Sequence, residues 1–264
     1  MEILSDAYAR YVSESLNSAA GELLSGEKTA VAFSGGLDSG IVAALCKRYA
    51  ESTVLYTVGT EKSYDVLRSA SAAEALGLKH KYIGIGTENI ESVLKEMIRA
   101  TGTEDPLILS FEVPTFCVMK HSAEKTVAGG MGADELFAGY MKYVGLSENE
   151  YREMLSEDLP RLEKALEFER KAAEHFGKKA VAPFSHGTVR KTVSRIPYEY
   201  LSSSGPAERK TLLKKAASHL GCGFLASAEK KAAQYGSGVS GLIKAKAKEK
   251  GLTLPEYVSS LAED

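Results

Sequence analysis

The sequence predicts an α/β protein in which helices cover both faces of a parallel sheet and a helical C-terminal half follows. Up to Tyr143, apolar runs of strand length alternate with amphipathic segments of helix length. The strand-length runs are apolar throughout, which is typical of strands buried on both faces. Glycine-rich motifs follow two of these runs, at the strand ends where such sheets bind ligands.

The elements of the first half follow from local patterns. Residues 6–24 carry an apolar stripe at helical spacing, and Gly26 is a plausible stop. Strands are expected at 29–33, 53–58, 80–85 and 126–128. Helices are expected at 65–76, 87–100 and 111–121.

The second half begins with a helix signal. Ser147 and Glu150 have the spacing of a capping box, and the segment Asp158–Pro160 is expected to open a charged helix that lasts to about Phe176. Further helices are expected after 204–206 and 253–255. We expect one domain over residues 1–264, with an N-terminal helix at 1–26, an α/β core at 27–145 and a helical half at 146–264 packed on it.

Composition excludes several classes of protein. The chain has 264 residues, of which 44% are hydrophobic and 26% charged, and these values are typical of globular proteins. A net charge of −2 argues against a polyanion binder as a whole, although residues 206–250 are rich in Lys and Arg. That region is either a set of solvated helix faces or a basic lip for ATP phosphates or RNA.

Cysteine and histidine usage points to a reducing compartment and to structural roles. The three cysteines, Cys46, Cys117 and Cys222, lack the spacing of zinc or iron–sulfur ligands, and the five histidines lack it too. The N-terminus has no signal-peptide pattern, and no run of about 18 apolar residues occurs. We therefore expect a cytoplasmic protein without a membrane segment.

The most informative stretch reads Ser-Gly-Gly-Leu-Asp-Ser from Ser34 to Ser39, at a strand-to-helix turn. The first amides of a helix lack partners, and the helix dipole directs positive charge to such a turn. Gly35 and Gly36 allow close approach of the backbone to an anion. Asp38 would repel a phosphate unless Mg²⁺ lay between them. The pattern is not a Walker A loop, and a plain glycine-rich helix cap is the competing interpretation.

A second informative stretch begins at Gly130 and reads Gly-Met-Gly-Ala-Asp-Glu-Leu-Phe-Ala-Gly-Tyr. Its glycines again permit close approach to a ligand, and Asp134 can supply a second carboxylate to a metal ion on pyrophosphate. Glu135 begins a helix, where an acid suits the dipole. A helix N-terminus with dipole-favoured acids is the competing interpretation.

These stretches carry a resemblance to a known family. Residues 34–39 resemble the PP-loop of the N-type ATP pyrophosphatases, which holds the β,γ-pyrophosphate of ATP while a nucleophile attacks the α-phosphate. Residues 130–140 resemble the Gly-Glu-Gly-Ser-Asp-Glu-Leu-Phe-Gly-Gly-Tyr type of segment in the synthetase domain of the asparagine synthetases. Similarities of lower specificity occur at 55–59, at 181–184 and at 230–238, where the superfamily, which includes β-lactam synthetase, has a lysine-bearing loop. The resemblance implies an adenine nucleotide alpha hydrolase-like fold that uses ATP and Mg²⁺.

Carried over by position, the resemblance implies a set of site residues. Pyrophosphate and Mg²⁺ would be held by Ser34, Gly35, Gly36, Asp38 and Ser39, with Asp134 joining the metal ion. The adenosine would be flanked by Phe33, Val58, Gly129 and Gly130. Lys230 would stabilise charge as an acyl-adenylate forms and breaks, with Lys231 as a second candidate and a surface lysine as the competing interpretation. Lys230, Asp38 and Asp134 would then be the catalytic set.

Three departures from the family pattern shape the expected activity. The chain opens Met1-Glu2 without a catalytic cysteine, so free ammonia, a separate glutaminase subunit or another nucleophile is expected to supply nitrogen. Met131 stands where the asparagine synthetases have Glu, and a thioether cannot act as a base. Ala228 and Glu229 replace the usual Arg-Pro before the loop lysine.

The first hypothesis is an asparagine synthase-like, AMP-forming carbon–nitrogen ligase that activates a carboxylate, by default aspartate. The second is a PP-loop ATPase that modifies tRNA, although the sequence lacks the Cys-x-x-Cys pair of thiolating relatives. The third is a nucleotide-binding scaffold without turnover. Small-molecule substrates are the expected partners, and a homo-oligomer is compatible with the sequence. The acceptor carboxylate, the nitrogen donor and the oligomeric state stay open.

Overall fold

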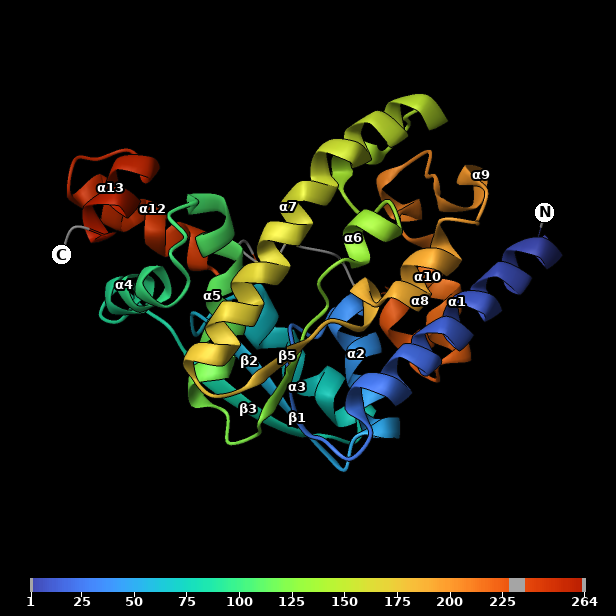
Figure 1. Ribbon diagram of the computed structural model, residues 1–264, viewed down its shortest axis with the longest axis horizontal. Coiled ribbons are helices and arrows are strands. Elements are labelled where there is room, and N and C mark those ends of the chain that lie inside the picture. The colour runs from blue at the N-terminus through green and yellow to red at the C-terminus, as the bar shows by residue number, and fades with distance from the viewer. Residues whose placement is uncertain (1, 228–235, 263–264) are drawn as a thin grey trace.

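A computed structural model describes residues 2–227 and 236–262, and its centre is a five-stranded parallel sheet in the order β3-β2-β1-β4-β5 (Figure 1). The strands are β1 (Lys28–Ala32), β2 (Ser52–Gly59), β3 (Lys79–Gly84), β4 (Thr126–Ala128) and β5 (Lys179–Val181). The α/β class predicted from the sequence is confirmed.

Helices connect and cover these strands. In the first half they are α1 (Glu2–Leu24), α2 (Leu37–Tyr49), α3 (Tyr64–Leu76), α4 (Ile90–Thr101), α5 (Pro106–His121) and α6 (Ala133–Leu136). In the second half they are α7 (Glu148–His175), α8 (Gly187–Val193), α9 (Tyr198–Leu201), α10 (Thr211–His219), α12 (Val239–Glu249) and α13 (Leu254–Ala262).

The order of the strands creates a switch point beside β1. From β1 the chain winds outward to β2 and β3, and it then returns to pair β4 with the other side of β1. Ligands of open parallel sheets bind beyond the carboxyl ends of the strands at such a reversal. Both glycine-rich stretches begin there, one after Ala32 and the other after Ala128.

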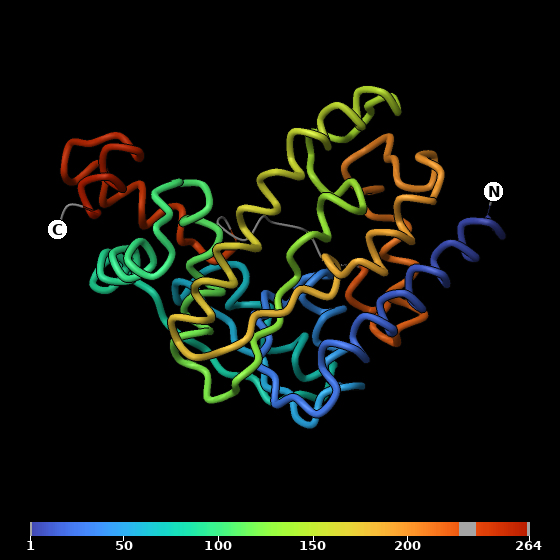
Figure 2. Tube along the Cα trace, in the orientation of Figure 1, coloured from blue at the N-terminus to red at the C-terminus, as the bar shows by residue number. Residues whose placement is uncertain are grey.

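Alternation of side chains along the central strands divides the core between the two faces of the sheet. Val31 and Leu55 pack with α1, α2 and α10 on one face, whereas Ala30 and Tyr56 pack with α4, α5 and α7 on the other. Helices α4, α12 and α13 gather at one end of the molecule and α1, α8, α9 and α10 at the opposite end, so the two chain ends lie far apart (Figures 1 and 2).

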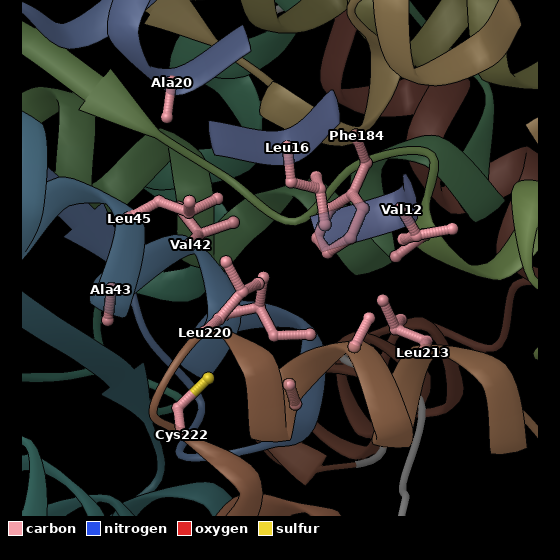
Figure 3. Packing of buried hydrophobic residues seen from close by; sticks show 14 of the residues in the cluster. Val12, Leu16, Ala20, Val42, Ala43, Leu45, Phe184, Leu213, Leu220 and Cys222 are labelled. Carbon is pink, nitrogen blue, oxygen red and sulfur yellow. The ribbon is translucent and has the colours of Figure 1, made fainter. Parts of the chain in front are cut away.

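Helix α1 belongs to the core although it precedes the sheet. Val12 and Leu16 are fully buried, and Figure 3 shows them close to Phe184 and to the side chains of α2 and α10. The helix therefore links the start of the chain to segments that follow the last strand.

The structure corrects several expected boundaries in the second half. The capping box at Ser147 is present and begins α7, which runs on through Pro160, so the predicted helix start at Asp158–Pro160 is wrong. The half expected to be helical also contributes β5, and the helix expected after Pro206 begins instead at Thr211, after a short 3₁₀ turn. The third strand is a polar edge strand that pairs only with β2, rather than an apolar strand covered on both faces.

Among the described residues, no helix is both long enough and apolar enough to cross a lipid bilayer.

Truncation of Leu16 tests how much α1 contributes to the core. Leu16→Ala should lower the free energy of unfolding by about 2–5 kcal/mol, because it removes buried methyl groups and leaves a cavity. Leu4→Ala on the same helix is the matched control, since Leu4 is 55% exposed. Denaturant unfolding measures both, and equal effects of the two substitutions would contradict the packing described.

Candidate active site

A cavity of about 550 Å³ opens at the carboxyl ends of β1, β2 and β4. Its walls come from the two glycine-rich loops, from α5 and from α7, which crosses the sheet in Figure 1. The residues expected from the sequence that line it are Phe33, Ser34, Asp38, Ser39, Val58, Gly129, Gly130 and Asp134. The structure brings these side chains and glycines together, while their binding roles stay a prediction.

The loop after β1 is held in shape by its own serines. The hydroxyl of Ser39 accepts from the amide of Ser34 at 3.2 Å and lies 3.1 Å from the hydroxyl of Ser34. The amide of Gly36 in turn donates to the Ser34 hydroxyl at 3.3 Å. Gly36 is the residue before α2, so the positive end of that helix faces the loop. The loop can thus present hydroxyl groups and helix N-terminal amides to an anion.

Gly35 and Gly36 are not wall residues of the cavity, and Gly35 has a packing role. Its φ of +73° is a left-handed conformation that favours glycine, and a Cβ placed on it would lie 3.0 Å from the Cα of Ser69 in α3. Arg68 of α3 donates to the carbonyl oxygen of Gly35. This glycine therefore lets the loop rest directly on α3.

The second loop lies directly against the first. A Cβ placed on Gly130 would come within 3.3 Å of the Cβ of Asp38. The amide of Gly129 donates to the carbonyl oxygen of Val181 at 3.0 Å, which ties the loop to the end of β5. A side chain at Gly130 would push Asp38 away by a few tenths of an ångström, so glycine allows the closest approach of the two loops.

Lys210 joins the two loops. Its ammonium group lies 2.7 Å from a carboxylate oxygen of Asp38 and 2.9 Å from one of Asp134, and only 2% of its side chain is exposed. Burial lowers the pKa of Lys210, and the charge of Asp38 opposes that shift. Lys210 also has a φ of +58°, which is unusual for a residue with a side chain and costs backbone energy. The contact with the two carboxylates holds it in that conformation.

The donor set around Lys210 fits a hard divalent cation. Asp38 and Asp134 each contact Lys210 through one carboxylate oxygen, and Mg²⁺ is usually bound through one or two carboxylates together with phosphate oxygens and water. Among the described residues, no group of three or more His, Cys, Asp or Glu side chains could hold a metal ion without such help. The two carboxylates would therefore hold Mg²⁺ jointly with the phosphates of a nucleotide.

A pair of buried acids lies on the α5–α7 side of the site. Glu169 of α7 lines the cavity and is 3% exposed, and Glu112 of α5 is 0% exposed. Neither carboxylate oxygen of Glu112 has a hydrogen-bond partner within the described residues. Burial, together with the nearby Glu169, raises the pKa of Glu112 well above its usual range, and burial raises the pKa of Glu169 to about 7.

Polar contacts also order the mouth of the cavity. Asp158 of α7 accepts hydrogen bonds from Tyr143, Lys142 and Arg161. The hydroxyl of Tyr140 donates to Glu135 at 2.7 Å. Asp158 is only 4% exposed and lies two residues before Pro160, so this cluster fixes α7 where the proline removes a helix hydrogen bond.

Several functional candidates escaped the sequence reasoning. In the sequence, Lys210 is one of many basic residues between 206 and 250. No local signal marks it, because its partners Asp38 and Asp134 lie 172 and 76 positions away in the chain. Glu112 and Glu169 were also missed; an acid inside an otherwise apolar helix segment is the signal that could have indicated Glu112. Lys230 and Lys231, the expected catalytic lysine and its alternative, lie outside the described residues.

Removal of the Lys210 charge tests its position between the two carboxylates. Lys210→Met should lower stability by about 3–5 kcal/mol, because it leaves the two carboxylates without the cation they share. Millimolar Mg²⁺ should restore part of that loss, whereas NaCl at equal ionic strength should not. Lys214→Met is the control, since its ammonium group donates to the carbonyl oxygen of Ala207 at the surface and pairs with no carboxylate among the described residues. Thermal unfolding measures all of these, and an absent Mg²⁺ response in Lys210→Met would count against the shared cation position.

The raised pKa of Glu169 predicts a pH-dependent stability. In the unfolded chain this acid ionises near pH 4.5, but in the folded protein it ionises near pH 7. Its ionisation therefore lowers stability as the pH rises from about 4.5 through 7, by roughly 1.4 kcal/mol for each unit of pKa shift. Glu169→Gln should be more stable than the wild type at pH 8 and show no such gain at pH 4.5. A gain that is equal at both pH values, measured by urea unfolding, would contradict the shifted pKa.

Comparisons with known proteins show which family the chain resembles in sequence. The family model for asparagine synthase matches residues 12–176, more than half of the chain. A protein assigned as glutamine-hydrolysing asparagine synthetase 1 of Methanocaldococcus jannaschii is 30% identical over 86% of this chain and 49% of its own length, so the chain spans about half of that relative. The glutamine-hydrolysing asparagine synthetase of Bos taurus is 31% identical over 53% of this chain and 27% of its own length.

Solved structures give more distant similarities. A predicted subunit of a tRNA methyltransferase from Methanocaldococcus jannaschii has a TM-score of 0.37 and 19% identity, covering 88% of this chain and 92% of its own. The NMN synthetase of Francisella tularensis has a TM-score of 0.36 and 16% identity, covering 74% of this chain and 95% of its own. The sequence matches are the decisive ones, and by them the chain belongs to the asparagine synthase family.

Proposed function

We propose that this protein is an ATP-dependent amide ligase that forms AMP and pyrophosphate. A carboxylate substrate attacks the α-phosphate of ATP, and a nitrogen nucleophile then displaces AMP from the acyl-adenylate. The observation that carries the proposal is the convergence of Asp38, Asp134 and Lys210 at the edge of the loop after β1, within a cavity of about 550 Å³. Membership of the asparagine synthase family supports it.

The loop after β1 is suited to the pyrophosphate. The N-terminus of α2 and the Ser34 and Ser39 hydroxyls can stabilise the negative charge that develops as pyrophosphate leaves the α-phosphate. The hydrogen bonds among these serines preorganise the donors before a ligand binds. A loop that is already in place does not have to reorganise during the reaction.

Lys210 and the two aspartates manage the charge at the same position. Mg²⁺ would neutralise the phosphates when it is held by Asp38 and Asp134. Lys210 contributes a fixed positive charge in a site that excludes bulk water, where such a charge acts more strongly than at the surface. Burial lowers the pKa of Lys210, and the charges of Asp38 and Glu135 oppose that shift.

The part of the cavity at the ends of β1 and β2 is suited to the base and ribose of the nucleotide. Phe33, Tyr56 and Val58 are each 3% exposed or less and form an apolar wall at the ends of β1 and β2. Apolar surface of this kind binds a flat aromatic ring and excludes water from the reacting groups.

We propose aspartate and ammonia as the default substrates. The relatives named above are asparagine synthetases that hydrolyse glutamine, and aspartate is the carboxylate that such a ligase converts to asparagine. Ammonia is proposed to come from outside this chain, either free or from a separate glutaminase. The position of Met131 in the cavity wall leaves the second step without the acid that the asparagine synthetases carry there.

Release of pyrophosphate and AMP from ATP and Mg²⁺ tests the proposed function. The wild type should release both when aspartate and ammonium are present, and Asp38→Ala should reduce the rate by at least about 100-fold because it removes a carboxylate that positions charge at the leaving group. Asp6→Ala is the matched control, because Asp6 lies on the surface of α1.

Other results of the same assay would favour the alternative functions. ATP turnover that requires tRNA instead of aspartate would favour an ATPase that modifies tRNA. Binding of ATP without turnover under any condition would favour a nucleotide-binding scaffold, and failure to bind ATP would contradict the site as a whole.

A further inference from the structure

The buried pair of acids has no part in ATP activation as described, yet Glu169 faces the reaction cavity. A Cβ placed on Gly129 would lie 3.3 Å from a carboxylate oxygen of Glu169, so this carboxylate rests against the start of the loop that holds Met131. Within the described part of the chain, Glu169 makes no hydrogen bond or ion pair, and its neighbour Glu112 has two oxygens without partners. Buried acids usually have partners, and exceptions need a functional reason.

The loop lacks an acid of its own at the corresponding place. Met131 occupies the position between two glycines where the asparagine synthetases have Glu, and its thioether cannot accept a proton from an amine. Glu169 reaches the same loop from the opposite wall, at the end of the loop where Gly129 has no side chain to exclude it. At the Gly129 end of this loop the cavity therefore has a carboxylate supplied by α7, in addition to Asp134 and Glu135 farther along the loop.

We propose that Glu169 is the general base that accepts a proton from the nitrogen nucleophile in the second half-reaction. This inference rests on the amide-ligase function proposed above and names a further catalytic residue for it. The nitrogen lone pair forms the new bond to the acyl carbon, and the bond from that carbon to the AMP oxygen breaks with its electron pair leaving on AMP. The proton lost by nitrogen passes to the Glu169 carboxylate and afterwards to solvent through the mouth of the cavity.

Glu112 explains why Glu169 can accept that proton. Two buried carboxyl groups in contact do not both ionise readily, so one proton stays on the pair at neutral pH. Glu112 is the more deeply buried of the two and does not line the cavity, so it keeps the proton and leaves Glu169 as the ionised member. Burial raises the pKa of Glu169 to about 7, and a base with a pKa near the working pH is the most effective one.

Hydroxylamine separates the two half-reactions. It is neutral at pH 7.5 and nucleophilic enough to trap an acyl-adenylate as a hydroxamate without help from a base. With ATP, Mg²⁺ and aspartate, Glu169→Gln should form the hydroxamate within about threefold of the wild-type rate, while its amide formation from ammonium should fall by about 10²–10⁴-fold. Glu169→Asp should recover part of the loss, because it keeps a carboxylate on a shorter side chain.

Two matched variants accompany the test. Glu167→Gln lies on the same helix but is about half exposed and pairs with Arg170, so it should behave like the wild type. Glu112→Gln resembles the protonated form of that acid and should keep amide formation within about tenfold of the wild type. A purely structural role for the pair would impair both buried variants to a similar degree.

Three results would contradict the proposals, and each identifies which one fails. Wild-type amide formation by Glu169→Gln would overturn the inference and leave the ligase function intact. Loss of hydroxamate and amide together in Glu169→Gln would also overturn it, because the residue would then serve activation of the carboxylate. A wild type that forms no hydroxamate would refute the aspartate-activating ligase, and with it the base that this reaction requires.

Discussion

The contact of Lys210 with Asp38 and Asp134 is the constraint on which the rest of the site depends. A buried ammonium group is unfavourable unless anions accompany it, and here the two anions come from the two loops at the switch point of the sheet. The lysine comes from a helix start far along the chain, held in a left-handed backbone conformation. The Lys210 ammonium group thus joins the loop after β1, the loop after β4 and the start of α10, which packs on α1. The loops can meet in this way because Gly130 has no side chain between them.

The positions of the two glycine-rich loops were predictable from the sequence because their signals are local. The apolar runs before Ser34 and Gly129 placed β1 and β4 correctly, and a glycine-rich turn between a strand and a helix has a recognisable pattern. A parallel sheet places both turns at the same edge, and the pairing of β1 with β4 in the structure makes Asp38 and Asp134 neighbours there.

The other features of the fold and the site depend on contacts between distant parts of the chain, which local sequence patterns do not encode. A strand of three residues such as β5 is too short to show a period, and its pairing with β4 defines it. Proline favours the first turn of a helix, so the pattern at Pro160 predicts a helix start there, but α7 begins earlier, at its capping box. The contacts of Asp158 hold the helix through the proline. Lys210 looked like one of many basic residues, since only folding places it between two carboxylates.

Groups of two kinds line or adjoin the cavity, a lysine held by two aspartates and a pair of buried acids, and they suit the two half-reactions of the proposed amide ligase. At the loop after β1, fixed positive charge and helix amides favour the departure of pyrophosphate, a step that moves negative charge away from the nucleotide. Beside Gly129, the Glu169 carboxylate, which has no counterion among the described residues, would favour the departure of a proton, a step that moves positive charge away from nitrogen. Stabilising pyrophosphate and accepting a proton conflict at a single position. A lysine beside Glu169 would lower the pKa of the Glu169 carboxyl group and make it a weaker base. The two groups have different neighbours: Lys210 is paired with Asp38 and Asp134, and Glu169 has another acid, Glu112, near it. These different neighbours would allow one cavity to stabilise an anionic leaving group first and to accept a proton afterwards.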